Sequence, residues 1–429
     1  MKNVTRTELL PGVFLTHVKT DKFKTGCLNV TLLTQLSGTD AAHHALIPRV
    51  LLRGTKTHPD MTQISEKTEA LYGAKITPLI RKKGEIQCVS LFATFVDDAV
   101  LPPGETVFGA VAALVGDVLT NPVLERGRLS EAYVTSEREK LLDEIRGRIN
   151  NKGSYAVSRL VEQMCDGEDF ATFKLGTEAE AEEITAKSLT DAYRTLIATA
   201  PVELFYSGTA SVAVVEDALK NALSTLPREE PNLDLGTDVR LNSRDETARY
   251  FEETLDVTQG KLSIGFRLGD SMEDPDYPAI MLLHYLYGGS VNSKLFLNVR
   301  ERLSLCYYAS SVLEKHKGLL LVASGIEFDM FDKAKTEILA QLDAIARKDV
   351  SDDELIWAKQ ALVTDLAMLE DSLAETEDFY LDQTLLGEED DLSAQIKRVN
   401  SVSKDTLAKI ASGLELDAIY FLKGQTEGA

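Results

Sequence analysis

Two adjacent histidines, His43 and His44, are the first residues along the chain that could bind a metal ion. An ion held on one helix face needs a second ligand four residues after the first, because side chains at i and i+4 share a face. The fourth residue after His43 is Ile47 and the fourth after His44 is Pro48, and neither can bind a metal. We therefore interpret both histidines as ordinary polar residues that precede a helix.

A pair of carboxylates, Glu137 and Glu144, lies seven residues apart in a charged stretch from about Leu129 to Asn150 that is predicted to be helical. Seven residues are about two helical turns, so both side chains point from one face. Solvent-exposed helix faces often carry charged residues at such spacing. The pair alone therefore does not establish a site.

A third set of polar residues, Arg300 and Tyr307, lies in the second half of the chain. A guanidinium and a phenol can hold a peptide carbonyl and help to stabilise an oxyanion. By residue type alone, a helix-end ion pair and a core tyrosine are the alternative. The neighbouring Cys306 is a weaker candidate for a nucleophile, because no histidine is close in sequence and apolar neighbours raise the pKa of a thiol.

The elements that must position these residues begin with a strand from Cys27 to Leu33, followed by a helix. Proline inside a helix costs about 3 kcal/mol, so Pro48 favours a helix that begins late or kinks there. Arg53-Gly54-Thr55 follows, and then a second helix from Asp60 to Leu71 that ends at Leu71-Tyr72-Gly73-Ala74.

This order of elements resembles the start of the insulinase/pitrilysin/processing-peptidase family of zinc metallopeptidases. In that family an inverted zinc motif, HxxEH, precedes a Gly-Thr on the first helix. Counting back from Gly54, the first His, the Glu and the second His of the motif correspond to Ala45, Pro48 and Arg49. Ala45 has no donor atom, Pro48 can neither ligate nor accept a proton, and Arg49 keeps a positive charge that repels a dication. The resemblance therefore implies a zinc site that has lost its chemical residues.

The family's third zinc ligand is a Glu on a long helix, within a pattern of two Glu seven residues apart. Glu137 and Glu144 match this pattern, and Glu144 corresponds to the ligand. One carboxylate without the two His cannot hold zinc against water, so we interpret the pair as vestigial. We expect no catalytic residue, no metal and no other cofactor in this chain.

The segment from Asn292 to Tyr307 is similar to the family's S-x-L-F…R-E-x-x-x-L-x-Y segment. The resemblance implies that Arg300 and Tyr307 face a zinc site and bind the substrate backbone. The chain departs from the family at Ser304-Leu305-Cys306, where Gly-Leu-Ala is usual, and both donors are retained. Small members of the family form two-subunit enzymes in which one subunit holds zinc and the other supplies this Arg/Tyr pair. The chain resembles the second kind, in a bacterial cytoplasmic form.

The second half of the sequence repeats the first. Gly54 and Tyr72 are 18 residues apart, as are Gly289 and Tyr307. A repeat of about 200 residues indicates a duplicated domain and is too long for a solenoid. We therefore predict an α+β fold of two homologous domains, each an antiparallel-rich mixed sheet with helices packed on one face. The predicted domains are residues 1–226 and 241–429, joined by a linker at 227–240 that contains prolines and polar residues.

Composition restricts the class of protein and its partners. The 429 residues are 44% hydrophobic and 27% charged, as in ordinary globular proteins of two or more domains. The 46 basic and 68 acidic residues give a net charge of −22, which argues against binding to nucleic acid or an anionic membrane. No apolar run approaches the roughly 18 residues of a membrane span. No signal peptide is recognisable, and the four cysteines lie far apart, which favours the cytoplasm.

We expect a non-catalytic, peptide-binding subunit of a heterodimeric processing-type zinc peptidase. Its partner would be a family member of similar length with an intact HxxEH and the only zinc, and its ligand a peptide or protein substrate. The chain could form a homodimer when that partner is absent. The alternative is a structural or assembly protein on the same fold with no role in proteolysis, and the retained Arg300 and Tyr307 favour the first interpretation.

Overall fold

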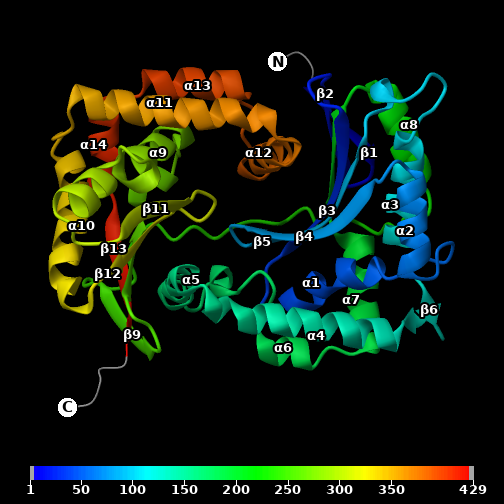
Figure 1. The fold of residues 1–429 in the computed structure, drawn as a ribbon, viewed down its shortest axis with the longest axis horizontal. Coiled ribbons are helices and arrows are strands. Elements are labelled where there is room, and N and C mark those ends of the chain that lie inside the picture. Colours follow the sequence, from blue (N-terminus) through cyan, green and yellow to red (C-terminus); the bar gives the residue numbers. More distant parts are fainter. Residues whose placement is uncertain (1–3, 425–429) are drawn as a thin grey trace. The chain divides into compact units, whose positions relative to one another are not determined.

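The computed structural model of the chain describes residues 4–424 and contains two large β-sheets, each in its own compact unit (Figure 1). In pairing order, the strands of the first sheet are β1 (Val4–Leu10), β2 (Val13–Lys19), β8 (Val202–Gly208), β3 (Thr25–Gln35), β5 (Ile86–Val96) and β4 (Lys75–Lys83). Those of the second sheet are β11 (Tyr308–Glu314), β12 (Leu319–Ile326), β10 (Gly260–Arg267), β13 (Glu415–Gly424) and β9 (Arg249–Leu255).

The two sheets have the same strand order. The order β2-β8-β3-β5-β4 in the first sheet matches β9-β13-β10-β12-β11 in the second. Each sheet contains one parallel pair, β2 with β8 and β13 with β9, and its other pairs are antiparallel. The predicted duplication and the antiparallel-rich mixed sheets are therefore confirmed.

In the first unit, one face of the sheet forms the main core. Leu28, Val30 and Leu32 of β3 are buried with residues from α1 (Ala41–Leu51), α3 (Phe108–Thr120) and α7 (Ala186–Thr199). Alternate residues of a strand point to opposite faces. Cys27 of the same strand accordingly packs on the other face, beside Leu373 and Tyr380 of α12 (Leu373–Leu386).

The two compact units are not continuous in sequence. The first contains the chain through Arg146, Thr172–Gly236 and Asp371–Glu388, and the second contains Gly147–Ala171, Thr237–Glu370 and the chain from Glu389 onward. The structure therefore differs from the predicted contiguous division at two exchanged segments. The change of unit after Gly236 lies inside the predicted linker, 227–240.

Each exchanged segment supplies one helix to its host sheet. Helix α12, from the second half of the sequence, packs on β3 and β8. Helix α5 (Lys152–Met164), from the first half, packs on β10, β12 and β13. The helices expected on one face of each sheet are thus joined by a single helix on the opposite face. Periodicity shows that a helix is amphipathic but not which sheet it covers, so the exchange could not be predicted.

Buried ion pairs attach both exchanged segments. In the first unit, Glu377 of α12 is 3% exposed and its carboxylate accepts hydrogen bonds from Arg81 and Asn29, each at 2.6 Å. In the second unit, Glu168 follows α5 and pairs with Arg267 at 2.6 Å and Lys317 at 2.8 Å. Neither basic side chain is exposed to solvent.

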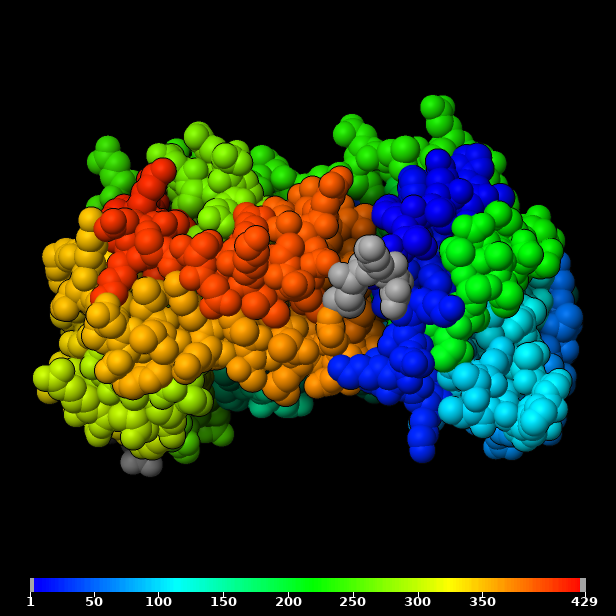
Figure 2. Space-filling model, turned by 90° about the horizontal axis from the view of Figure 1, so that it is seen from above, coloured from blue at the N-terminus to red at the C-terminus, as the bar shows by residue number. Residues whose placement is uncertain are grey.

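The remaining helices complete the two units. They are α2 (Met61–Ala70), α4 (Glu131–Gly147), α6 (Glu178–Glu182), α8 (Val212–Ala222), α9 (Tyr277–His284), α10 (Phe331–Ala346), α11 (Asp352–Met368), α13 (Leu392–Ser401) and α14 (Lys404–Ser412). Figure 2 shows α10, α11, α13 and α14, from yellow through orange to red, on one face of the second unit. Across residues 4–424, no helix has both the length and the apolar character needed to cross a bilayer.

The first helix differs from the prediction at its start. Helix α1 begins at Ala41, so His43 and His44 lie inside it and do not precede it. Pro48 lies in the second half of α1, which therefore does not begin late. The burial of Pro48 between neighbours of the first core offsets the cost of the missing backbone hydrogen bond.

Candidate functional site

The three positions of the degenerate zinc motif lie on α1 in the first unit. Ala45 is fully buried in the core and Pro48 is also buried. The side chain of Arg49 is 18% exposed, and its guanidinium pairs with the carboxylate of Glu144 on α4 at 2.7 Å. The residues at the second His position and at the third-ligand position therefore contact each other directly.

A second ion pair lies beside the first. Arg53, one helical turn after Arg49, donates to Glu137 at 2.8 Å and lies over the ring of Tyr133. Lys140 also pairs with Glu137, at 2.7 Å. Arg49 of α1 and Arg53, in the turn that follows α1, are thus each paired with a carboxylate of α4.

This set of side chains does not fit a zinc ion. Zinc is bound by thiolate, imidazole or carboxylate groups, whereas Ala45, Pro48 and Arg49 offer a methyl group, a pyrrolidine ring and a cation. The two histidines that precede the motif positions have other hydrogen-bond partners: a ring nitrogen of His43 lies 3.2 Å from Ser188 Oγ, and one of His44 lies 3.2 Å from Gln87 Oε1. Burial lowers the pKa of His44 below its usual value. Within residues 4–424, no group of three or more His, Cys, Asp or Glu side chains could hold a metal.

The two ion pairs border a cavity of about 500 Å³ in the first unit. Its lining includes Arg49, Arg53 and Glu137, together with residues 75–78 of strand β4. Strand β4 is an edge strand, because it pairs only with β5 in the sheet. The Nε–H groups of Arg49 and Arg53 are buried and have no hydrogen-bond partner in the described chain.

Arg300 and Tyr307 lie in the second unit. Arg300 lies on a π-helical turn, Leu295–Arg302, a rare conformation that recurs at functional sites. Its side chain is 40% exposed, lies over the ring of Phe296, and approaches Glu301 only at 3.6 Å. Tyr307 is 52% exposed, so it is not a core tyrosine. The structure shows no direct hydrogen bond or ring contact between Arg300 and Tyr307 among the described residues.

The hydroxyl of Tyr307 donates a short hydrogen bond to Glu327. This hydrogen bond and the negative charge of Glu327 raise the pKa of Tyr307, so the phenol keeps its proton at neutral pH. The backbone N–H of Tyr307 donates to the carbonyl of Gly325 at 2.8 Å, which fixes the residue at the start of β11. Tyr307 therefore keeps its phenolic proton and donates a hydrogen bond to Glu327, and Arg300 presents a partly exposed guanidinium.

The departure from the usual Gly-Leu-Ala has a visible consequence. Ser304 has a φ angle of 48°, in the left-handed region that glycine adopts at no steric cost. Here a serine takes that conformation. The next residues include Cys306, whose thiol pKa is raised by burial. A raised pKa leaves less thiolate, which disfavours Cys306 as a nucleophile.

Comparison with known proteins decides the family. The family model described as "Peptidase M16 inactive domain" matches residues 183–362. A relative from Bacillus subtilis (strain 168), the probable inactive metalloprotease YmfF, is 31% identical over 412 residues, 96% of either chain. The chain belongs to the M16 peptidase family. This is the insulinase/pitrilysin/processing-peptidase family that the sequence resembles, and the M16 matches confirm that prediction and support a non-catalytic role.

Solved structures of other proteins have the same fold. A conserved protein from Enterococcus faecalis V583 is 26% identical with a TM-score of 0.89, and each chain is covered completely. A chain of Complex III2 from Candida albicans is 15% identical with a TM-score of 0.73, over 99% of this chain and 96% of that chain. The second likeness concerns the fold alone.

Sequence reasoning assigned the motif positions but did not predict the ion pairs that these residues form. It treated Glu137 and Glu144 as vestiges and did not consider Arg53. The spacing contained a usable signal, because Arg49 and Arg53 are four residues apart and the two Glu are seven apart.

Proposed function

We propose that the chain is the non-catalytic, peptide-binding subunit of a heterodimeric processing-type zinc peptidase, and that Arg300 and Tyr307 act on a substrate held at the partner's zinc. The partner is an M16 member of similar length with an intact HxxEH. The chain itself uses no metal or other cofactor. A cytoplasmic location agrees with its four free cysteines.

One observation carries this proposal: the residues at the metal-ligand positions are replaced, whereas the two residues at the substrate-binding positions are retained. The motif positions are occupied by a buried alanine, a buried proline and an ion-paired arginine. Arg300 and Tyr307, in contrast, are accessible; Arg300 lies on a π-helical turn, and the backbone N–H of Tyr307 is held by the carbonyl of Gly325. A scaffold with no use for substrate would not need both donors exposed.

The first unit adds independent support for peptide binding. An extended peptide can pair with the free edge of a strand, and β4 presents such an edge beside the cavity at Arg49. The unpaired Nε–H groups of Arg49 and Arg53 could donate to peptide carbonyls, because a buried donor without a partner is costly. Pro78 on β4 lacks an N–H, which restricts the register of the peptide.

Co-expression with an HxxEH-bearing relative tests the proposal. We expect a heterodimer on gel filtration that cleaves a peptide substrate, whereas neither subunit does so alone. A stable heterodimer whose turnover equals that of the partner alone would favour the structural or assembly role. Failure to form a complex at micromolar concentration would contradict both.

A further inference from the structure

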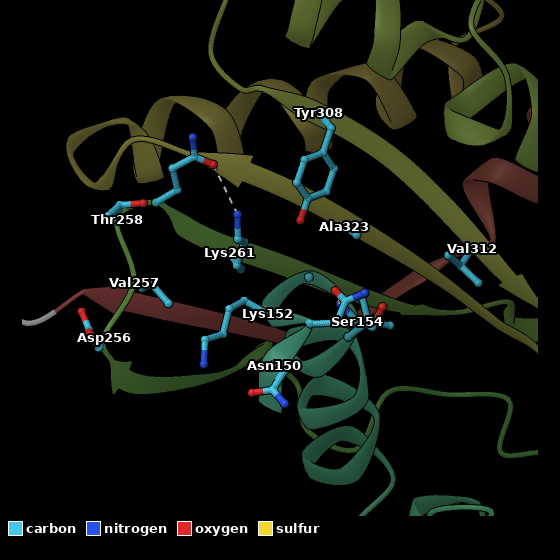
Figure 3. Close-up of a pocket in the computed structure, with 14 residues that line it drawn as sticks. Asn150, Lys152, Ser154, Asp256, Val257, Thr258, Lys261, Tyr308, Val312 and Ala323 are labelled. Atoms are coloured by element: carbon cyan, nitrogen blue, oxygen red, sulfur yellow. Dashed lines mark hydrogen bonds between the residues drawn. The ribbon is translucent and has the colours of Figure 1, made fainter. Parts of the chain in front are cut away.

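A cavity of about 1000 Å³ in the second unit has neither Arg300 nor Tyr307 in its described lining. It lies between the N-terminal end of α5 and the face of the sheet formed by β10, β11 and β12 (Figure 3). Its boundary also includes the segment Asp256–Gln259, which precedes β10. The proposed function assigns none of these residues a role, but Gln259 makes a side-chain hydrogen bond to Tyr307, so the cavity borders that residue.

Small residues on the sheet explain why the cavity exists. Tyr308, Gly325 and Lys261 lie in one row across three strands, because both Tyr308 and Lys261 are paired with Gly325. A Cβ atom on Gly325 would lie 2.5 Å from the Tyr308 ring, so only glycine lets the ring lie over β12. The next residue on this face of β12 is Ala323, which is also small and lines the cavity. These small residues therefore leave space between the sheet and the N-terminal end of α5.

The charge in this cavity is unusual for the protein. Lys152 at the start of α5 and Lys261 on β10 both line it, and neither has a carboxylate within ion-pair distance among the described residues. The ammonium group of Lys261 has only a long contact of 3.4 Å with Gln259 and the ring of Tyr308 at 5.6 Å. Burial lowers the pKa of Lys261. The chain has a net charge of −22, so two lysines in one cavity without a carboxylate partner in the described chain indicate a site for a bound anion.

The other lining groups limit what kind of anion fits. The phenol of Tyr308, the hydroxyls of Thr258 and Ser154 and the amides of Asn150 and Asn151 can all donate hydrogen bonds. Val157, Val257 and Val312 supply apolar surface in the same cavity. Figure 3 shows Lys152 and Lys261 between the Asp256–Gln259 segment and α5, with the Tyr308 hydroxyl directed towards the helix end. Asp256 is the one acidic residue in this described lining and disfavours a densely charged ligand.

We propose that this cavity binds the carboxylate of an acidic peptide segment, with Lys152 and Lys261 as the cations that hold it and Tyr308 as a hydrogen-bond donor. The peptide identity of the ligand rests on the proposed function; the carboxylate class rests on the cavity itself. The apolar lining accommodates a side chain beside the acidic one. The site would select ligands with an acidic segment that extends from the region held by Arg300 and Tyr307.

Direct binding to the isolated full-length chain tests this proposal. The probe is a fluorescein-labelled hexapeptide of alternating leucine and glutamate, and the matched probe has glutamine in place of glutamate and an amidated C-terminus. Binding is measured by fluorescence anisotropy at 0.15 M salt, because salt at this concentration screens the repulsion between the acidic peptide and the acidic protein. We expect the glutamate peptide to bind at least about tenfold more tightly than the glutamine peptide.

The variants separate this cavity from general charge effects. Lys152→Gln and Lys261→Gln are each expected to weaken binding of the glutamate peptide roughly tenfold, whereas Lys261→Arg retains most of it. Lys333→Gln is the matched control, because Lys333 is an exposed lysine on α10 in the same unit. Tyr308→Phe is expected to give a smaller loss, of a few-fold.

Three results would overturn the proposal: no preference for the glutamate peptide, equal loss in Lys333→Gln and Lys261→Gln, or displacement of the peptide by inorganic phosphate at concentrations below the peptide's own Kd. The last result would identify a site for a free inorganic anion. The assay requires no partner subunit, so these results overturn the carboxylate site alone. A failure to reconstitute peptidase activity would instead overturn the proposed function and leave the cavity's anion binding measurable.

Discussion

At the scale of single residues, Arg49 occupies the position of a metal ligand and forms a contact that a metal would otherwise make. It joins α1 to Glu144 on α4 through its own positive charge, and Arg53 does the same with Glu137. Glu144 is half exposed, so the energy of its pair is small, on the order of 0–1 kcal/mol. The pairs therefore preserve the geometry of the two helices more than they stabilise the fold.

The purified chain is expected to retain no stoichiometric zinc after dialysis and to cleave no peptide alone. Changing Ala45→His, Pro48→Glu and Arg49→His together should give only partial zinc binding. These changes supply ligands and release Glu144, but they do not restore the groups that orient the ligands. Metal analysis by mass spectrometry measures the zinc content of the wild-type chain and of the triple variant. One equivalent of zinc in the wild-type chain, lost in Glu144→Gln but not in Glu139→Gln, would show that the motif positions are wrongly assigned.

Ser304 gives a prediction about stability. A non-glycine residue in the left-handed region costs about 1–2 kcal/mol, and glycine restores about 0.5–1 kcal/mol of chain entropy to the unfolded state. Ser304→Gly should therefore raise the free energy of unfolding by up to about 1 kcal/mol. Urea unfolding measures it. Ser393→Gly on helix α13 is the control and should be destabilising, so stabilisation by both changes or by neither would contradict the backbone argument.

Residue-level reasoning can assign motif positions by counting along the chain, but it does not find partners that are distant in sequence. Gly54 fixes Ala45, Pro48 and Arg49 by simple counting. The pairing of Arg49 with Glu144 spans 95 residues and depends on how α1 and α4 pack. No local pattern contains that information.

At the scale of elements, the exchanged helix α12 is unusual because much of its buried surface is polar. Its buried residues include Thr376, Glu377, Asp382 and Gln383. A helix with such residues reads as solvent-exposed in a sequence. The polar, proline-containing linker and the repeated spacings alone predicted contiguous domains. The duplication of an α+β unit was predicted correctly, whereas the strand order was not predicted.

Removing the acid at the centre of this attachment should be costly. Glu377→Ala leaves the guanidinium of Arg81 buried beside α12 without its main partner, so a loss of about 3–5 kcal/mol in the free energy of unfolding is expected. Glu375→Ala is the control, because Glu375 is exposed on the same helix. Equal effects of the two changes in urea unfolding would contradict a buried attachment.

The corresponding attachment in the second unit predicts a dependence on pH. Although burial opposes it, the hydrogen bonds from Arg267 and Lys317 lower the pKa of Glu168 below its ordinary value of 4.5. A carboxyl whose pKa is lower in the folded state contributes stability above the unfolded pKa. This contribution is lost as the pH falls from about 4.5 through the lower folded pKa.

Thermal unfolding between pH 7 and pH 3 measures this effect. In Glu168→Gln the fall in Tm below pH 5 should be smaller than in the wild type, because one of the titrating groups is gone. Asp166→Asn, at an exposed neighbouring acid, is the control. A steeper fall in Glu168→Gln would contradict the sign.

At the scale of the whole molecule, the chain consists of two units with the same fold that differ in their candidate functional residues. The strand order is the same in both units, and the two tyrosines at matching positions, Tyr72 and Tyr307, both donate to a carboxylate, from Glu105 and Glu327 respectively. In the proposed function, the first unit lacks metal ligands at Ala45, Pro48 and Arg49, and the second unit supplies Arg300 and Tyr307 to the substrate. A heterodimer with a zinc-bearing relative gives both features a use.

The most direct test of this account is the turnover of the reconstituted heterodimer with single changes in this chain. Arg300→Ala and Tyr307→Phe should each lower kcat by about 10²-fold, as expected when a donor to the developing oxyanion is removed. Arg302→Ala, at an exposed arginine on the same π-helical turn, is the control and should leave kcat unchanged. Gel filtration and the partner's zinc content should be the same for all three variants. Wild-type turnover in both Arg300→Ala and Tyr307→Phe would contradict the account and leave this chain a structural subunit.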